Sequence, residues 1–380
     1  MEMLNGYSYE RVGCMSGIKT EAWVLISKEN RRSASFQKKE ITIRDTGSDE
    51  VLVKPLYSCL EGNYIHALKL KPESIFDRRN EDEVVLGNSG VVKVVKIGNH
   101  VKSVKLGDIC LMFSNGVQDE VGYPKLITAY DKPNTIGVFA KTINLRENEL
   151  IKIPENSKHS PQAWAAFSLK YITAWSNWNV AYKCWKSQMA EVDPKDTYVF
   201  GWGGGVTFAQ LTLAKLYGCK CYMMSSREER LQLLEAYGIT GIDRTKYSSE
   251  ELLELIRDET NGRGVSIFID YIGEPMLYKL TMKALGRQGV ITTAGWKEGS
   301  LLPVLRAQEC QQRHIHVFTH YARYQEGAEA VKYAEEKDWL PPLSNEEYKW
   351  EDLSELLHDY SQNKISSWFP VFKINDERDI

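Results

Sequence analysis

The spacing of hydrophobic and polar positions changes partway along the chain. Between about residues 51 and 154, short apolar runs recur between Gly, Asn, Asp and Pro residues, and this pattern predicts β-strands. From about Pro161 the apolar positions take helical spacing, and after residue 197 predicted strands alternate with predicted helices. This change predicts a β-rich unit followed by a doubly wound parallel sheet, an α/β fold. The early strands are predicted at 51–54, 91–95, 108–112 and 150–154.

Later segments complete this division. Strands are predicted at 266–270, 289–293 and 316–318, and the segment 250–256 has the amphipathic spacing of a helix. The β-like segment 368–374 we assign back to the first unit. We therefore expect a β-rich domain over 1–172, completed by 345–380, and a dinucleotide-binding domain over 173–344.

The composition excludes several classes of partner and compartment. The 380 residues carry a net charge of -3, which does not favour nucleic acid or an anionic membrane surface as partner. The seven cysteines are scattered without a CxxC pair, and no signal peptide precedes them, so we expect a reducing cytoplasm. No apolar run approaches the ~20 residues needed to cross a bilayer.

The segment 197–230 is the most informative part of the chain. An apolar run ends at Val199-Phe200, and a glycine-rich turn, a helical stretch and a second strand at 219–224 follow. In a βαβ unit such a turn lets the backbone approach a pyrophosphate at a helix N-terminus. The turn residues that we predict to bind cofactor are Gly201, Gly203, Gly204, Gly205 and Val206.

The end of the second strand indicates which dinucleotide binds. NAD sites usually have Asp or Glu here for the ribose 2'-hydroxyl, whereas a 2'-phosphate needs hydroxyl groups and cations. This chain has Ser225, Ser226 and Arg227, with Arg230 one helical turn further on, so NADPH is favoured. The alternative is that both arginines only solvate the start of a helix. We also count Ala294 and Gly295, after the strand at 289–293, among the cofactor-binding residues.

With these landmarks, the chain from about 20 to 374 resembles the medium-chain dehydrogenase/reductase superfamily. The resemblance implies a GroES-like catalytic domain and a Rossmann domain. Residues 242–245 and 316–322 look similar to the crotonyl-CoA carboxylase/reductase branch of the enoyl-thioester reductases. The motifs that carry the superfamily resemblance are Glu50–Lys54, Gly87–Val92, Val104–Asp108, Phe139-Ala140, Ile172–Trp175, the glycine turn, Phe268–Gly273 and Gly286–Val290.

Departures from the family predict the chemistry. Where zinc alcohol dehydrogenases present a Cys and a His-Glu pair, this chain has Glu61, Asn88 and Ser89, so we expect no metal. Without a Lewis acid, hydride transfer to an activated C=C bond is favoured over alcohol or ketone chemistry. The final glycine of the phosphate turn is replaced by Val206 or Thr207, which predicts altered or weaker dinucleotide binding.

The resemblance also implies where substrate chemistry takes place. The loop 59–66 corresponds to the loop in which the family places its catalytic residues, facing the nicotinamide. We therefore expect Glu61, Asn63, Tyr64 and, from a late strand, His320 to serve as catalytic residues across one cleft. The alternative for each loop residue is a local hydrogen bond. A Phe-Glu pair of the carboxylating members is missing, being about Lys132-Pro133 here, which argues against carboxylation.

Two further patterns allow more than one interpretation. His314, His316 and His320 occupy alternate positions, which would place them on one strand face, although HxH spacing alone is weak evidence for metal. Aromatic residues at three-and-four spacing form one helical stripe that predicts core packing or a dimer interface, with a modified acyl pocket as the alternative; they are Trp175, Trp178, Tyr182 and Trp185.

The sequence thus predicts an NADPH-dependent, zinc-independent reductase of an α,β-unsaturated thioester on CoA or a carrier protein, forming a homodimer. The alternatives are a quinone or enone reductase, a reductive carboxylase, and an NADPH-binding protein without turnover.

Overall fold

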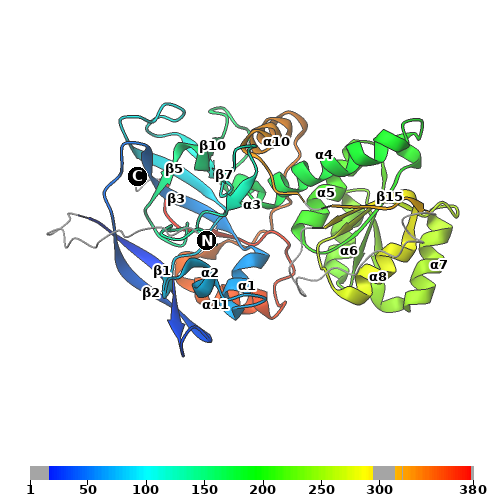
Figure 1. Cartoon of the computed structure of the whole chain (residues 1–380), viewed down its shortest axis with the longest axis horizontal. Coiled ribbons are helices and arrows are strands. Elements are labelled where there is room, and N and C mark those ends of the chain that lie inside the picture. The colour runs from blue at the N-terminus through cyan, green and yellow to red at the C-terminus, as the bar shows by residue number, and fades with distance from the viewer. Residues whose placement is uncertain (1–16, 294–312, 319, 378–380) are drawn as a thin grey trace, which may run out of the picture.

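The computed structural model describes residues 17–293, 313–318 and 320–377. Figure 1 shows two parts side by side, a β-rich part and a part built around a parallel sheet. The predicted cofactor residues Ala294 and Gly295 lie outside the described residues. No helix in the described part of the chain is long and apolar enough to cross a membrane.

The β-rich part is organised around the long strand β3. It pairs antiparallel with β5, β9 and β18, so a strand from near the C-terminus completes the sheet, as the sequence predicted. The sheet order is β10-β6-β5-β3-β18-β17, and a second sheet has the order β2-β1-β4. The bounds are β1 Ile18–Lys28, β2 Ser33–Ile43, β3 Glu50–Cys59, β4 Glu83–Val84, β5 Val91–Ile97, β6 Ile109–Met112, β7 Val117–Gln118, β8 Pro124–Leu126, β9 Ile143–Arg146, β10 Leu150–Lys152, β17 Tyr348–Lys349 and β18 Val371–Lys373.

The second part contains a six-stranded sheet in the order β13-β12-β11-β14-β15-β16, and every neighbouring pair is parallel. Its central strands β11 and β14 are buried along their whole length, as expected when helices cover both faces. The strands are β11 Tyr198–Trp202, β12 Lys220–Ser225, β13 Thr240–Asp243, β14 Val265–Asp270, β15 Leu285–Thr293 and β16 His316–Phe318. The helices between them are α5 Gly205–Leu216, α6 Glu228–Ala236, α7 Ser249–Glu259 and α8 Pro275–Ala284.

The remaining helices lie in or beside the β-rich part, or connect it to the sheet (Figure 1). They are α1 Gly62–Lys69, α2 Ile75–Arg79, α3 Pro161–Phe167, α4 Lys170–Gln188, α10 Tyr324–Lys337 and α11 Leu353–Ser361. The predicted aromatic stripe lies on α4, where Trp175, Trp178 and Trp185 are buried in the core and Tyr182 packs against it. The packing interpretation of the stripe is confirmed.

The prediction that three histidines share one strand face is wrong. Of the three histidines, only His316 lies in strand β16. The left-handed backbone of His314 (φ 52°) interrupts the extended conformation before the strand. His320 follows the end of the strand. His316 Nε2 lies 3.0 Å from Gln288 Oε1, so its ring has a partner on the neighbouring strand β15.

Candidate active site

The glycine turn after β11 is shaped by Gly201, Gly203 and the side chain of Thr207. Gly203 has φ 140°, and a Cβ there would lie 2.4 Å from Thr207 Oγ1, so the turn requires glycine. Thr207 is one of the two residues that replace the last glycine of the predicted turn, and its hydroxyl donates to the Trp202 carbonyl at 3.1 Å. A Cβ on Gly201 would lie 2.6 Å from the Thr207 methyl group, so Gly201 and Gly203 make room for that side chain. Helix α5 begins directly after the turn, at Gly205.

The two arginines at the tip of β12 contact a distant segment of the chain. Arg227 donates to the carbonyl oxygens of Asn363 and Ile365, the second at 3.1 Å. Arg230 Nε donates to the Ser366 carbonyl at 2.9 Å. We call residues 363–369 the strap. Burial, reinforced by the Arg227 charge, lowers the pKa of Arg230 to about 10.

The strap also closes over the glycine turn. A Cβ on Gly205 would lie 3.1 Å from the Trp368 carbonyl oxygen and 3.0 Å from the Phe369 ring. The Phe208 ring of α5 packs against both, with centroid distances of 5.1 and 5.9 Å. Because the strap continues into β18, it joins the β-rich sheet to the phosphate turn. The predicted cofactor residues Gly205, Arg227 and Arg230 are therefore brought together by the strap.

The loop after β3 contains a buried ion pair. Lys170 Nζ, at the start of α4, lies 2.8 Å from Glu61 Oε2, and it also donates to the Leu60 carbonyl at 2.7 Å and to Cys59 Sγ at 3.1 Å. Lys170 and Glu61 are 4% and 2% exposed, so neither charge is stabilised by water. Burial alone would lower the pKa of Lys170, but the Cys59 and Glu61 groups outweigh it and raise that pKa. Burial raises the pKa of the Glu61 carboxyl.

The other predicted loop residues pair with the segment that follows β4. The Tyr64 hydroxyl lies 3.0 Å from Ser89 Oγ, and Asn63 Nδ2 donates to Asn88 Oδ1 at 3.1 Å. Tyr64 is fully buried, with its ring edge against Phe139, and burial raises its pKa. These contacts agree with the local hydrogen-bond interpretation for Tyr64. Two buried acceptors, Glu61 Oε1 and Asn63 Oδ1, have no hydrogen-bond partner within the described chain.

The residues in the zinc-ligand positions do not fit zinc. The Glu61 carboxylate faces an ammonium group, and Asn88 and Ser89 offer an amide and a hydroxyl already bonded to Asn63 and Tyr64. Burial raises the pKa of the Cys59 thiol to about 12, which opposes the thiolate form that zinc requires. Over residues 17–293, 313–318 and 320–377, no three His, Cys, Asp or Glu side chains are grouped as metal ligands.

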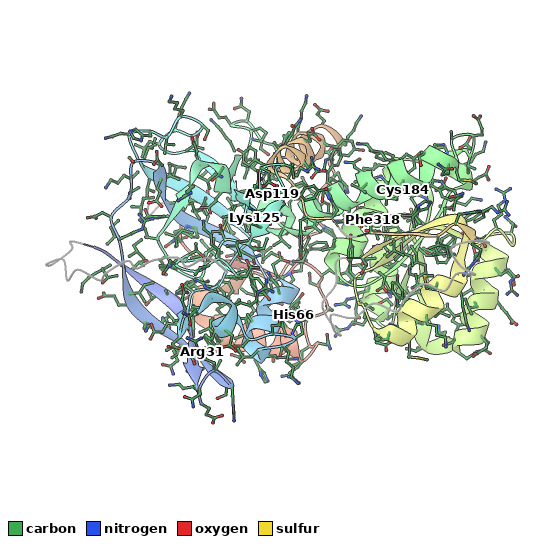
Figure 2. The ribbon with its side chains drawn as sticks, viewed as in Figure 1. Arg31, His66, Asp119, Lys125, Cys184 and Phe318 are labelled. Atoms are coloured by element: carbon green, nitrogen blue, oxygen red, sulfur yellow. The ribbon has the colours of Figure 1, made fainter. Side chains whose placement is uncertain are left out.

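His320 is buried in a different environment from Glu61. Its Nδ1 lies 3.4 Å from the Tyr123 hydroxyl and its Nε2 lies 3.0 Å from both Glu326 oxygens. Tyr123 belongs to the β7–β8 hairpin, which Asp119 and Lys125 mark in Figure 2. The hydrogen bonds described for His320 thus go to the hairpin, to α10 and, through its carbonyl, to Asn177 on α4. None joins it to Glu61, Asn63 or Tyr64.

The residues that sequence reasoning missed are polar groups on buried elements. Lys170 is one of them, and Asn177 is another, since its amide donates to the His320 carbonyl at 2.8 Å and its oxygen lies 3.4 Å from Thr292 Oγ1. A lysine and an asparagine on the same helix as the aromatic stripe, α4, were the available signal, because long charged side chains are rarely buried unless paired.

Comparison with known proteins supports the fold and a redox role. Residues 205–336 match the family model described as zinc-binding dehydrogenase. An L-threonine 3-dehydrogenase of Caldanaerobacter subterraneus is 24% identical over 74% of this chain and 77% of its own length. An acryloyl-coenzyme A reductase of Sulfurisphaera tokodaii is 23% identical over 77% of this chain and 83% of its own length.

Solved structures repeat the architecture across almost the whole chain. A 2-octenoyl-CoA carboxylase reductase, solved with NADP and 2-octenoyl-CoA, superposes with a TM-score of 0.76 at 16% identity, covering 94% of this chain and 89% of that one. At this identity the likeness concerns the fold, a β-rich domain with a Rossmann-like domain, as the sequence predicted.

Proposed function

We propose that this chain, which belongs to the medium-chain dehydrogenase/reductase superfamily of oxidoreductases, reduces the C=C bond of an α,β-unsaturated thioester with NADPH. The observation that carries the proposal is the ion pair between Lys170 and Glu61. It places an ammonium group against the carboxylate at a zinc-ligand position of the alcohol dehydrogenases. A site without a Lewis acid favours reduction of an activated double bond, since the conjugated carbonyl oxygen takes the developing charge.

The cofactor-binding residues fit a dinucleotide. Gly203, Gly204 and the start of α5 would hold the pyrophosphate, because backbone amide groups at a helix N-terminus attract anions. Ser225, Ser226 and Arg227 would hold the 2'-phosphate, and no carboxylate stands among them to repel it. When bound, NADPH supplies the hydride.

The chain's own residues would bind the acyl group and provide its proton. Glu61 is the strongest candidate donor, because a carboxyl with a raised pKa holds a proton closer to neutral pH. Asn63 Oδ1 and Glu61 Oε1 accept no hydrogen bond within the described residues. A hydroxyl or amide group of the substrate would donate a hydrogen bond to them. His320, held by Glu326 and Tyr123, would orient the acyl chain rather than share the proton step.

Two features of the relatives support a thioester as substrate. The acryloyl-coenzyme A reductase and the 2-octenoyl-CoA carboxylase reductase have names that specify enoyl groups on CoA. We also propose that the substrate acyl group is carried on CoA or on a carrier protein. The protein is proposed to assemble as a homodimer.

The test measures NADPH consumption with enoyl-CoA esters, carrier-bound enoyl groups and small enones or quinones. We expect turnover on a thioester, and single replacements of Glu61 and Asn63 that lower turnover while NADPH affinity is retained. Turnover confined to quinones or small enones would refute the thioester assignment. Binding of NADPH without consumption in any arm would contradict an enzymatic role.

A further inference from the structure

The first part of the strap is an exposed segment that follows helix α11. We call residues 363–366 the latch. Three of its four side chains are exposed, and of the four only Ile365 packs against a hydrophobic core. Residues 364–367 belong to neither a helix nor a strand. Trp368 and Phe369, which follow, are 4% and 1% exposed. The latch therefore has few side-chain contacts to hold it, while the residues after it anchor the strap in the core.

Two arginines hold the backbone of the latch. Both terminal nitrogens of Arg227 donate hydrogen bonds, one to the Asn363 carbonyl and one to the Ile365 carbonyl at 3.1 Å. Arg230 Nε donates to the Ser366 carbonyl at 2.9 Å. Across residues 17–293, 313–318 and 320–377, no other donor to these three carbonyl oxygens is found. The two arginines therefore decide whether the latch stays against the end of β12.

The arginines themselves lack a close countercharge. Neither forms an ion pair with a carboxylate in the described part of the chain, and their hydrogen bonds end on neutral carbonyl oxygens. Burial and the charge of Arg227 lower the pKa of Arg230 to about 10, and the Glu229 carboxylate offsets this only in part. An anion bound beside both guanidinium groups would therefore stabilise them.

A 2'-phosphate competes with the latch carbonyls for the same donors. Phosphate oxygens pair with two N–H groups of one guanidinium, and both terminal nitrogens of Arg227 already donate to the latch. Attraction between opposite charges strengthens the bonds to phosphate, whereas a carbonyl oxygen is neutral, so the phosphate is the preferred acceptor. Lys364 pairs with Asp359 at 2.7 Å, but such an exposed ion pair contributes little to holding the latch.

We propose that the latch is a sensor for the 2'-phosphate of NADPH, held by Arg227 and Arg230 in the cofactor-free protein and released when the phosphate takes over their guanidinium groups. This inference rests on the proposed function, because it takes NADPH as the cofactor. NADH has no phosphate at this position, so it leaves the latch in place. Since the strap continues into β18, release loosens one connection between the β-rich part and the parallel sheet once NADPH has bound.

Limited proteolysis of the full chain tests the latch, since trypsin cleaves after Lys364 within it. Cleavage of a native protein follows the population in which the segment is open. We expect saturating NADPH to accelerate cleavage at Lys364 about 10-fold or more, and saturating NADH to leave it unchanged. Cleavage after Arg32, which is exposed in the turn between β1 and β2, serves as the internal reference and should not change.

Variants separate the arginine bonds from general effects on the protein. Arg227→Ala/Arg230→Ala should be cleaved at Lys364 about 10-fold faster without any cofactor, and NADPH should add no further increase. Arg257→Ala removes an exposed cation from α7 and should behave as the parent does. Cleavage of Arg227→Ala/Arg230→Ala at the parent rate would show that these bonds do not hold the latch.

NADPH affinity, measured by fluorescence titration of the same samples, keeps the latch distinct from the proposed function. Tight NADPH binding with unchanged or slower cleavage at Lys364 would overturn the latch and leave the cofactor assignment intact. Equal acceleration by NADH and NADPH would also overturn it, because release would then not depend on the 2'-phosphate. Failure of NADPH to bind would overturn the latch and the proposed function together.

Discussion

The Lys170 ammonium group lies 2.8 Å from the Glu61 carboxylate, and both are buried where the β-rich loop meets the start of α4. Lys170 also packs beside the phosphate turn, because a Cβ on Gly205 would lie 2.7 Å from its Cδ. One side chain thus connects the candidate catalytic loop to the candidate cofactor turn. Any motion that separates the two parts of the molecule would have to break or carry this pair.

Removing one partner of the pair should destabilise the chain strongly. We expect Lys170→Met to lower the free energy of unfolding by about 3–5 kcal/mol, because it leaves the Glu61 carboxylate buried without a counter-charge. The double variant Lys170→Met/Glu61→Gln should recover part of this loss. Urea denaturation of both provides the measurement. A loss below about 1 kcal/mol for Lys170→Met would mean that the pair is hydrated in solution.

The protein should be purified without stoichiometric zinc. Lys170, Asn63 and Tyr64 already bond the groups in the zinc-ligand positions, so a metal would have to displace three sets of contacts. We expect elemental analysis to find well under one zinc per chain and turnover to survive a chelator. A content near one zinc per chain, lost together with activity, would be incompatible with the proposed chemistry.

The arginines at the end of β12 should determine cofactor preference. Replacing Arg227 and Arg230 with Ala should cost NADPH roughly 1.5–3 kcal/mol of binding free energy per lost charge-assisted bond. The affinity for NADH should be almost unaffected, since NADH lacks the 2'-phosphate. Fluorescence titration with both cofactors measures the difference.

The same two titrations distinguish binding of the 2'-phosphate by the arginines from their structural role in holding the strap. Both arginines donate hydrogen bonds to carbonyl groups of the strap. If they have only this role, their loss would weaken the binding of NADPH and of NADH equally. Equal weakening, or NADH binding as tightly as NADPH in the parent protein, would exclude a 2'-phosphate site here.

Turnover should depend on the protonation of Glu61. Burial raises the pKa of this carboxyl above its ordinary value of 4.5, so the protonated donor persists below the raised pKa and is lost as pH rises through it. Turnover of the parent should therefore fall as pH rises. Glu61→Gln should be slower by about 10²–10⁴-fold and lack this pH dependence. The exposed Glu73→Gln serves as control, and a profile that Glu61→Gln shares with the parent would remove Glu61 from the proton step.

The glycines of the phosphate turn should differ in tolerance. Gly203→Ala should lower the free energy of unfolding by about 1–3 kcal/mol, because φ 140° strains an L residue and its Cβ would overlap Thr207 Oγ1. Gly204→Ala is the matched control, since φ there is -115° and a Cβ would meet nothing within 4 Å. Thermal unfolding of both variants measures this contrast. Equal costs would show that the turn adopts another conformation in solution.

The sequence by itself determined the two-part architecture and the glycine turn. Strand alternation, helical spacing and glycine placement are local signals, and they located β3, β5, β11, β14, α7 and the return of β18 correctly. The prediction that Glu61, Asn88 and Ser89 occupy zinc-ligand positions also comes from the sequence, because it depends only on residue type at aligned positions.

Only the tertiary structure decided which side chains meet. Lys170 and Glu61 lie 109 positions apart in sequence, and the Arg227 contacts with the strap span 136 and 138 positions. A local sequence pattern predicts neither the Lys170–Glu61 pair nor the Arg227 contacts with the strap. The histidine prediction was wrong because His314 has a left-handed backbone conformation that alternate spacing in the sequence does not reveal.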